Sequence, residues 1–496
     1  MEALSIKEIA SAVNGSIVSG SEELEISQVN TNSKAFLEGG LFVPIVGERV
    51  DGHNYIQDAF ANGAQACFTH KILDYIPGMT YILVNHTVDA LQALGTYYRN
   101  KFDIPVIGIT GSVGKTTTKE MVAAALETTY KVLKTEGNMN SQVGLPLMML
   151  KLDSSHEIAV IEMGMSEEGE MERLAKIARP DVAVVTNIGV SHIAQLKTRE
   201  NIRKEKLNII NEFSEDSKLF INGNDALLYE MVTNNDIEVS ALTKEKLNSC
   251  KVITYGEGND FDYRAYEVNF LDEKTDFRLS ISEDKKLDNK KSEDTINLND
   301  LNKHKELGPT EEAIHLQVLG IHNVYNALAA LAVAKHYQIP VSIAKEGLRN
   351  YQPIAMRGQI LLAGGIKIID DSYNASPDSM KSGIEVLKSL GEVKRKFAVL
   401  ADIKELGDIS KQSHYEVGEF LVNQPIEGVI TIGEEAKEIG RALKDHQSGV
   451  NVDSFSNNEE ALTFLLENLK PGDGLLVKGS RGMKTDEIVK GLTTGR

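Results

Sequence analysis

A glycine-rich turn between a strand pattern and a helix pattern is the feature that most limits how this chain folds. The turn reads Gly111-Ser112-Val113-Gly114-Lys115-Thr116-Thr117 and lies between IPVIGIT (104–110) and the helical pattern KTTTKEMVAAALETT (115–129). Glycines let backbone N–H groups surround phosphate oxygens, and the helix N-terminus adds a positive dipole. The lysine and a following hydroxyl reach the terminal phosphates and Mg²⁺. The turn therefore predicts that ATP and Mg²⁺ bind at the end of a buried strand.

This motif is one glycine short of its commonest form, because Ile109 stands five residues before Gly114. A plain turn between strand and helix is the alternative interpretation. The flanking strand and helix patterns favour the nucleotide-binding interpretation.

Short β-branched runs alternate with helical patterns along most of the chain, which is typical of parallel sheets covered by helices. A length of 496 residues allows about three domains. We predict an α/β protein with a small N-terminal α/β domain (1–85), a central P-loop ATPase domain with a mostly parallel sheet (86–352) and a C-terminal Rossmann-like α/β domain (353–496). Charged and amide side chains dominate residues 283–310, so we expect a solvated surface insert there, with a regulatory or partner-binding segment as the alternative.

The charge balance excludes several classes of protein. With 53 basic and 72 acidic residues the net charge is −19, which disfavours binding to nucleic acids and to anionic lipids. Cys67 and Cys250 lie far apart, so neither a disulfide framework nor a zinc ribbon is expected. No apolar run is long enough to span a bilayer, and the first ten residues lack a secretion signal. We expect a soluble, cytoplasmic protein.

Two further side chains follow strand patterns at positions suited to a nucleotide's metal. Glu162 closes the run AVIE, and His192 follows the strand pattern DVAVV in the stretch TNIGVSHI. Each alone is more often a structural residue. Together with the phosphate loop they indicate an assembled metal site.

The chain resembles the Mur ligases in ordered motifs along its whole length. These are GITGSVGKTTTKE (108–120), TEGNMNSQVGLPL (135–147), IEMGMSEEGE (161–170), TNIGVSHI (186–193), GIHNVYNALAA (320–330), DDSYNASPDSM (370–380), LADIKELG (400–407) and VKGSRGM (477–483). The resemblance implies an ATP-dependent amide ligase of peptidoglycan precursor synthesis. Its expected substrates are UDP-N-acetylmuramoyl-tripeptide, bound by the N-terminal domain, and D-alanyl-D-alanine. The expected form is a monomer.

The resemblance also implies roles for individual residues in the central domain. Lys115 and Thr116 are expected to hold the phosphates and a first Mg²⁺, with Glu162 in the same region. His192 is expected to bind a second Mg²⁺. Lys206 matches the lysine that is carbamylated in relatives, which converts a cation into an anionic oxygen ligand. On residue type alone, Lys206 is a solvated lysine on a charged helix.

Other positions are expected to contact the nucleotide. Asn138 is expected near the γ-phosphate or the incoming carboxylate, and Asn323 and Asn326, three residues apart, near the adenine. Arg357 matches a catalytic arginine that reaches the phosphates, and Asp371 matches a ribose-binding acid.

The substrate-binding residues are less closely matched to the family. Tyr373 and Asn374 are expected to line the amine-substrate pocket, and Ser33 to lie at the uridine site. Relatives usually read TDSR at that site, whereas this chain has Thr31-Asn32-Ser33-Lys34. This departure leaves two alternatives open: a divergent ligase for another carboxylate and amine, and an ATP-dependent switch without catalysis.

Overall fold

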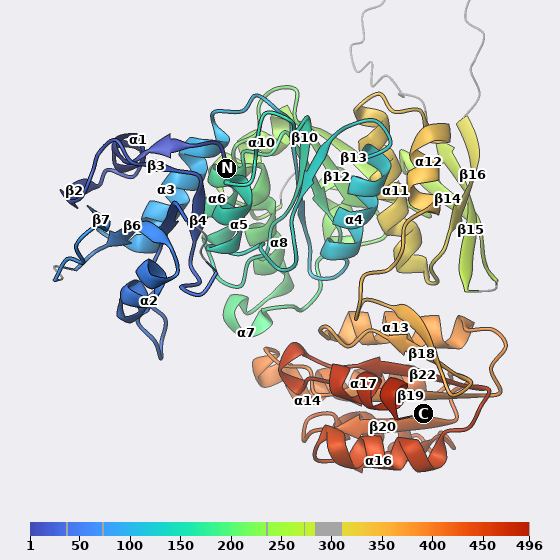
Figure 1. The fold of residues 1–496 in the computed structure, drawn as a ribbon. Helices are drawn as coiled ribbons and strands as arrows, with labels where there is room; N and C mark the ends of the chain where they lie inside the picture. The colour runs from blue at the N-terminus through green and yellow to red at the C-terminus, as the bar shows by residue number, and fades with distance from the viewer. Residues whose placement is uncertain (36–37, 72–73, 235–236, 272, 283–309, 496) are drawn as a thin grey trace, which may run out of the picture.

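Three separate sheets organise the protein in the computed structural model, as Figure 1 shows from blue to red along the chain. The structure describes residues 1–496 except 36–37, 72–73, 235–236, 272, 283–309 and 496. The predicted surface insert therefore lies outside the described residues, apart from the first residue of the strand that follows it. The three-domain α/β prediction is confirmed in its fold class, because each sheet is largely parallel and each carries helices.

The N-terminal sheet has the strand order β2-β7-β6-β5-β4. Strands β7, β6, β5 and β4 run parallel and β2 is antiparallel to β7, while β1 and β3 form a separate antiparallel pair. The elements are β1 (Leu4–Ser5), α1 (Ile6–Ala12), β2 (Ser16–Ser19), β3 (Glu25–Ile26), β4 (Gln28–Asn30), β5 (Gly40–Phe42), η1 (Gly52–Tyr55), α2 (Ile56–Ala61), β6 (Ala64–Thr69), β7 (Thr80–Leu83) and α3 (Thr87–Arg99). The loop Thr31–Lys34 follows β4 at the carboxyl edge of this sheet.

The central sheet has the order β16-β15-β14-β13-β12-β11-β8-β10-β9 and is parallel from β14 to β9. Strand β15 is antiparallel to both of its neighbours, β14 and β16. Its strands are β8 (Val106–Thr110), β9 (Val132–Lys134), β10 (Ile158–Glu162), β11 (Val182–Val185), β12 (Lys218–Asn222), β13 (Lys251–Gly256), β14 (Tyr263–Leu271), β15 (Lys274–Ile281) and β16 (Thr310–Leu316). Strands β8, β10 and β11 are entirely buried, as continuous apolar runs between two helical layers should be.

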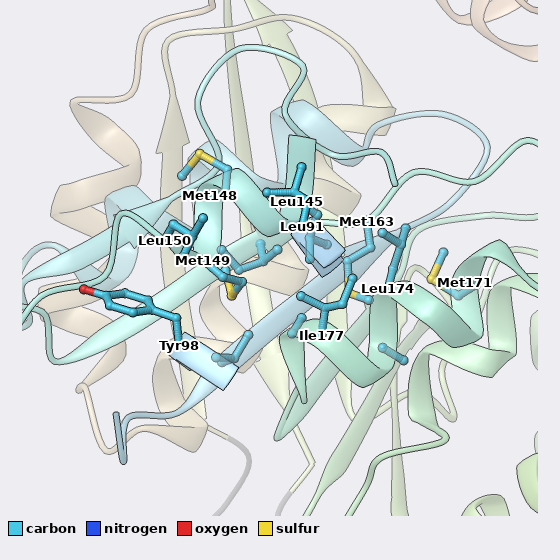
Figure 2. Packing of buried hydrophobic residues seen from close by; sticks show 14 of the residues in the cluster. Leu91, Tyr98, Leu145, Met148, Met149, Leu150, Met163, Met171, Leu174 and Ile177 are labelled. Carbon is cyan, nitrogen blue, oxygen red and sulfur yellow. The ribbon is translucent and has the colours of Figure 1, made fainter. Parts of the chain in front are cut away.

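Helices cover both faces of this sheet. They are α4 (Lys115–Leu126), α5 (Gly144–Met149), α6 (Glu170–Ala178), α7 (Ile193–Leu196), α8 (Arg199–Leu207), η2 (Asn208–Ile210), α9 (Ala226–Thr233), α10 (Ala241–Ser249), α11 (Ile321–His336) and α12 (Val341–Arg349). One core joins α4, α11 and α12 to one face, and the other core joins α3, α5, α6 and α8 to the opposite face. Figure 2 shows Leu91 and Tyr98 of α3 beside side chains of α5 and α6. Helix α3 thus fixes the N-terminal part of the chain to the central sheet.

The C-terminal sheet has the order β17-β18-β22-β19-β20-β21, with only β17 antiparallel to its neighbour. Its elements are β17 (Gln359–Ala363), β18 (Ile366–Asp370), α13 (Pro377–Ser389), β19 (Arg395–Ala401), η3 (Gly407–Ile409), α14 (Ser410–Leu421), β20 (Gly428–Ile432), α15 (Lys437–Asp445), β21 (Asn451–Phe455), α16 (Asn458–Asn468), β22 (Asp473–Lys478), η4 (Arg481–Met483) and α17 (Asp486–Thr494). In the described part of the chain, no helix has the length and apolar character needed to cross a membrane.

Candidate active site

The phosphate loop connects β8 to α4, as the sequence predicts. Gly114 has a φ of 86°, in the left-handed region that side chains disfavour, and it caps α4. A Cβ atom on Gly111 would lie 1.9 Å from Thr186 Oγ1. Both glycines are therefore needed for the loop to adopt this shape.

The segment after β11 holds the loop in place. Asn187 Oδ1 accepts a hydrogen bond from the Val113 N–H at 2.8 Å, and the Thr186 hydroxyl donates to the Val113 carbonyl at 2.6 Å. The Ser112 N–H donates to the Asn187 carbonyl at 3.0 Å. Sequence reasoning quoted this segment as a family motif but missed the role of Thr186 and Asn187 as supports of the loop.

Two lysines, the half-buried Lys115 and the buried Lys206, meet at the start of the loop. Lys115 Nζ donates to the Gly111 carbonyl at 2.8 Å, and Lys206 Nζ donates to the same oxygen at 3.1 Å. Burial lowers the pKa of Lys115, with Glu162 opposing and Arg357 adding to the shift. Burial lowers the pKa of Lys206 well below its ordinary value, and the positive charge of Lys115 lowers it further. Burial of this kind destabilises the charged form of a lysine side chain relative to the neutral form. Lys206 is thus not the solvated lysine that its charged helix indicated.

Glu162 ends β10 and is almost fully buried. Its Oε1 accepts a hydrogen bond from Asn140 Nδ2 at 2.6 Å, and its backbone N–H donates to Thr135 Oγ1 at 2.9 Å. Its Oε2 is buried and makes no hydrogen bond within the described residues. A buried carboxylate oxygen without a partner is costly unless a cation or a donor joins it.

Two asparagines of the segment after β9 lie in different environments. Asn138 is exposed and lies in the turn after β9, whereas Asn140 reaches the Glu162 carboxylate. Asn140 thus orients the Glu162 carboxylate, a role that sequence reasoning did not assign to it. The exposed Asn138 stays available for the predicted contact with the γ-phosphate or the incoming carboxylate.

His192 lies between the central and C-terminal domains. It precedes α7 with a φ of 62°, and its Nδ1 lies 2.9 Å from Glu405 Oε2 in the loop after β19. The imidazole beside it lowers the pKa of the Glu405 carboxyl. Sequence reasoning did not identify Glu405.

The two asparagines of α11 lie against the phosphate-loop helix. Asn326 Oδ1 accepts from the Thr118 hydroxyl at 2.8 Å, and Asn326 Nδ2 donates to Asn323 Oδ1 at 3.2 Å. Asn323 Nδ2 also donates to the Leu319 carbonyl at 2.8 Å, which stabilises the start of the helix. The predicted side-by-side arrangement of Asn323 and Asn326 is present.

The C-terminal domain brings one of its predicted residues directly to the loop. Arg357 Nη2 lies 3.4 Å from Thr116 Oγ1. Asp371, after β18, is paired with Lys478 at 2.5 Å. Asn374 Oδ1 accepts hydrogen bonds from the Ala375 and Arg481 N–H groups at 2.9 and 3.4 Å.

Ser33 lies in the N-terminal domain, in the loop after β4, and is largely buried. Its carbonyl accepts from Asn62 Nδ2 at 3.0 Å. The Asn32 side chain accepts from the Lys34 N–H at 3.0 Å, which gives the loop a local turn.

Two of the four predicted metal ligands carry the oxygen donors that hard cations prefer. Thr116 supplies a hydroxyl and Glu162 a carboxylate, and Glu162 Oε2, unpartnered within the described residues, is the atom that most needs a cation. His192 and Lys206 supply nitrogen atoms, which suit Mg²⁺ less well. Among the described residues, no group of three or more His, Cys, Asp and Glu side chains converges on one point. A site here therefore depends on a hydroxyl, phosphate oxygens or a modified lysine as well.

Comparison with known proteins gives the same family in each domain. The model of the Mur ligase middle domain matches residues 109–334, that of the Mur ligase glutamate ligase domain matches residues 356–481, and that of the Mur ligase family catalytic domain matches residues 25–132.

Individual relatives extend this similarity over the full length. The UDP-N-acetylmuramoyl-tripeptide--D-alanyl-D-alanine ligase of Bacillus subtilis (strain 168) is 36% identical over 490 residues, 98% of each chain. A crystal structure of MurF from Acinetobacter baumannii superposes with a TM-score of 0.83 at 28% identity, covering 100% of this chain and 99% of that one. MurF from Thermotoga maritima in complex with ADP superposes with a TM-score of 0.77 at 28% identity, covering 94% and 97%. This chain therefore belongs to the Mur ligase family.

Proposed function

We propose that this Mur ligase joins D-alanyl-D-alanine to the C-terminal carboxylate of UDP-N-acetylmuramoyl-tripeptide, with ATP converted to ADP and phosphate. One observation carries the proposal: a half-buried and a buried lysine contact the phosphate loop, and a carboxylate that is only partly paired within the described residues and an arginine of another domain lie near them. The name of the Bacillus subtilis relative, which matches along the whole chain, supports the substrate pair.

The chemistry starts from a carboxylate that cannot form an amide unaided, because hydroxide is a poor leaving group. The carboxylate attacks the γ-phosphate in line, giving an acyl phosphate and ADP. The amine of D-alanyl-D-alanine then attacks the acyl carbon, and phosphate leaves. Lys115 and Arg357 offset the negative charge that otherwise keeps the carboxylate away from the phosphate. No side-chain nucleophile is required.

Magnesium would be held by Thr116, Glu162, His192 and a carbamylated Lys206, and it would supply positive charge to the transferring phosphoryl group. The fit of Lys206 to this role rests on its depressed pKa, because CO₂ adds only to a neutral amine. Carbamylation would also replace a buried amine by an anion beside the cationic Lys115.

The remaining polar residues bind and orient the substrates. Asn323 and Asn326 lie beside the helix of the phosphate loop, on the adenine side. Asp371 offers a carboxylate for the ribose, and Asn138 an exposed amide near the incoming carboxylate. Ser33 lies on the uridine side. Asn374 shapes the amine pocket, because it fixes the backbone at Arg481.

The reaction belongs to peptidoglycan precursor synthesis, and we expect it to run in the cytoplasm on a monomeric enzyme. Size-exclusion chromatography with light scattering tests the monomer, and a mass of two chains would contradict it.

The decisive experiment measures phosphate release from ATP and Mg²⁺ with the UDP-tripeptide and D-alanyl-D-alanine, separately and together. Release that needs both substrates, with the pentapeptide product seen by mass spectrometry, is the expected result. Lys115→Ala is the control that removes the phosphate-loop lysine. ATP binding without phosphate release would contradict the proposed substrates. Phosphate release with another carboxylate and amine would then identify a divergent ligase. No release with any carboxylate and amine tested would favour an ATP-dependent switch without catalysis.

A further inference from the structure

Tyr373 lies against the arginine that reaches the phosphate loop. The Arg357 Cζ atom is 4.0 Å from the centroid of the Tyr373 ring, a distance that puts the guanidinium in direct contact with the ring. The Tyr373 N–H donates to the Met356 carbonyl at 3.2 Å, so the backbones of the two segments are also joined. The tyrosine and the arginine thus form one local unit.

Arg357 has a demanding position. It belongs to the C-terminal domain, yet its Nη2 atom lies 3.4 Å from Thr116 Oγ1 in the central domain. An arginine side chain has many rotamers, and ordering it costs free energy. A rigid ring beside the guanidinium restricts those rotamers before the nucleotide arrives, and its π-face attracts the positive charge.

The ring of Tyr373 carries this contact, and the hydroxyl does not. Within the described residues the Tyr373 hydroxyl has no hydrogen-bond partner. A second guanidinium, that of Arg481, lies 5.6 Å from the same ring centroid. Asp486 lies 3.7 Å from Arg481 and offsets its charge, whereas the Arg357 guanidinium is directed at the phosphate loop.

We propose that Tyr373 is a positioning residue for ATP: its ring face holds the Arg357 guanidinium in the orientation that meets the phosphates. This inference rests on the phosphate-binding role proposed for Arg357. Tyr373 would then not line the amine-substrate pocket, as expected from the sequence, but would act on nucleotide binding through Arg357. Loss of the ring should therefore weaken binding of a triphosphate and leave the affinity for D-alanyl-D-alanine unchanged.

The test compares Tyr373→Leu, which removes the ring, with Tyr373→Phe, which keeps it. Titration calorimetry with a non-hydrolysable ATP analogue and Mg²⁺ gives the affinities. Tyr373→Leu is expected to weaken binding roughly 3- to 30-fold, the range for one cation–π contact, and Tyr373→Phe is expected to restore it. In an Arg357→Met background, Tyr373→Leu should have no further effect, because the contact is already lost.

A matched control exists in the same domain. Tyr415 stacks on Arg441 at 4.9 Å, far along the chain from the nucleotide residues, so Tyr415→Leu removes the same kind of contact without touching Arg357. It should leave the affinity for the ATP analogue unchanged. Thermal melts of all variants separate loss of binding from loss of folding.

Three results would overturn the inference: equal ATP-analogue affinity for Tyr373→Leu and wild type, equal losses for Tyr373→Leu and Tyr373→Phe, or additive effects with Arg357→Met. A rise in the KM for D-alanyl-D-alanine alone would restore the pocket role. The wild type could form no pentapeptide while the affinity for the ATP analogue still depends on an aromatic ring at position 373. That result would contradict the proposed substrates and support the positioning role of Tyr373.

Discussion

The ATP side and the uridine side of this molecule are built in opposite ways. On the ATP side Lys115 and Lys206 share the Gly111 carbonyl, and Glu162, near Lys115, has one carboxylate oxygen without a partner among the described residues. On the uridine side the loop Thr31–Lys34 satisfies itself: the Asn32 N–H donates to Asn30 Oδ1 at 2.9 Å, and Asn32 Oδ1 accepts from the Lys34 N–H. The ATP side is poised for a ligand, whereas the loop is stable without one.

This contrast explains which positions tolerate change. The ionisable groups beside the phosphate loop lose hydration when the protein folds, which costs free energy of folding. A bound phosphate or cation offsets this cost, so the residue types at these positions are constrained. The loop needs only a side-chain oxygen at position 32, and asparagine supplies one as well as aspartate does. The departure from TDSR therefore preserves the loop turn, although it removes one negative charge at position 32 and exchanges one cation for another at position 34.

Removing the phosphate-loop lysine should break the ATP side most severely. Lys115→Ala is expected to lower kcat by roughly a thousandfold, because a preorganised cation at the transferring phosphate is lost. Steady-state phosphate release measures the effect. A loss below about tenfold would mean that the phosphate charge is neutralised elsewhere.

The unpaired carboxylate oxygen gives the next largest effect. Glu162→Gln keeps the shape and the Asn140 contact, with the amide flipped as needed, but removes the negative charge. We expect the Mg²⁺ concentration for half-maximal activity to rise about 10- to 100-fold. Glu405→Gln, which alters the partner of His192, is the comparison variant. An unchanged Mg²⁺ requirement in Glu162→Gln would exclude this carboxylate as a metal ligand.

In CO₂-free buffer, where Lys206 is unmodified, this buried lysine should lower the free energy of unfolding. Because its pKa is lowered on folding, the unfolded chain binds more protons there, so stability rises with pH until the ordinary lysine value of 10.5 is reached. Lys206→Met is therefore expected to raise Tm at about pH 7, with a smaller gain at about pH 10. Thermal melts across this range measure it, and adding bicarbonate should raise the wild-type Tm alone.

Lys119 offers a matched control for that experiment. It is equally buried, but its Nζ lies 2.6 Å from Glu120 Oε1 and 2.7 Å from the Thr135 carbonyl. Lys119→Met should lower Tm, because Glu120 keeps only Lys134, 3.0 Å away, as a partner and the Thr135 carbonyl loses its donor. If Lys206→Met also lowers Tm at neutral pH, Lys206 is a satisfied structural lysine.

The smallest effect is expected on the uridine side. Asn32→Asp should change the free energy of unfolding by less than about 0.5 kcal/mol, whereas Asn32→Ala should cost about 1 kcal/mol through the lost turn. Denaturant titration checks both. A large loss in Asn32→Asp would show that the amide N–H₂ group, and not the oxygen, matters in this loop.

Sequence reasoning was strongest where backbone geometry dictates residue type. The glycines at 111 and 114, the strand that ends at Glu162 and the helix that starts at Lys115 were all predicted, because a phosphate loop admits few alternatives. The paired asparagines of α11 were predicted from their helical spacing.

Contacts between segments far apart in the sequence could not be predicted from local patterns. Lys206 donates to a carbonyl 95 positions away, and Arg357 meets Thr116 across 241 positions, so the resemblance alone pointed to these residues. The contact of His192 with Glu405 depends on how two domains pack, and the stacking of Tyr373 on Arg357 depends on how two loops pack. No local pattern encodes such pairs.

The crowding around the phosphate loop also bears on inhibition. A compound that binds the N–H groups of this loop would contact a surface that substitution cannot easily reshape, since a side chain at 111 collides with Thr186 and one at 114 strains the backbone. Resistance would then have to arise at residues around the loop, for instance at Asn138 or Tyr373. Inhibitors that bind the loop backbone should therefore keep their potency longer than inhibitors that depend on contacts with these surrounding side chains.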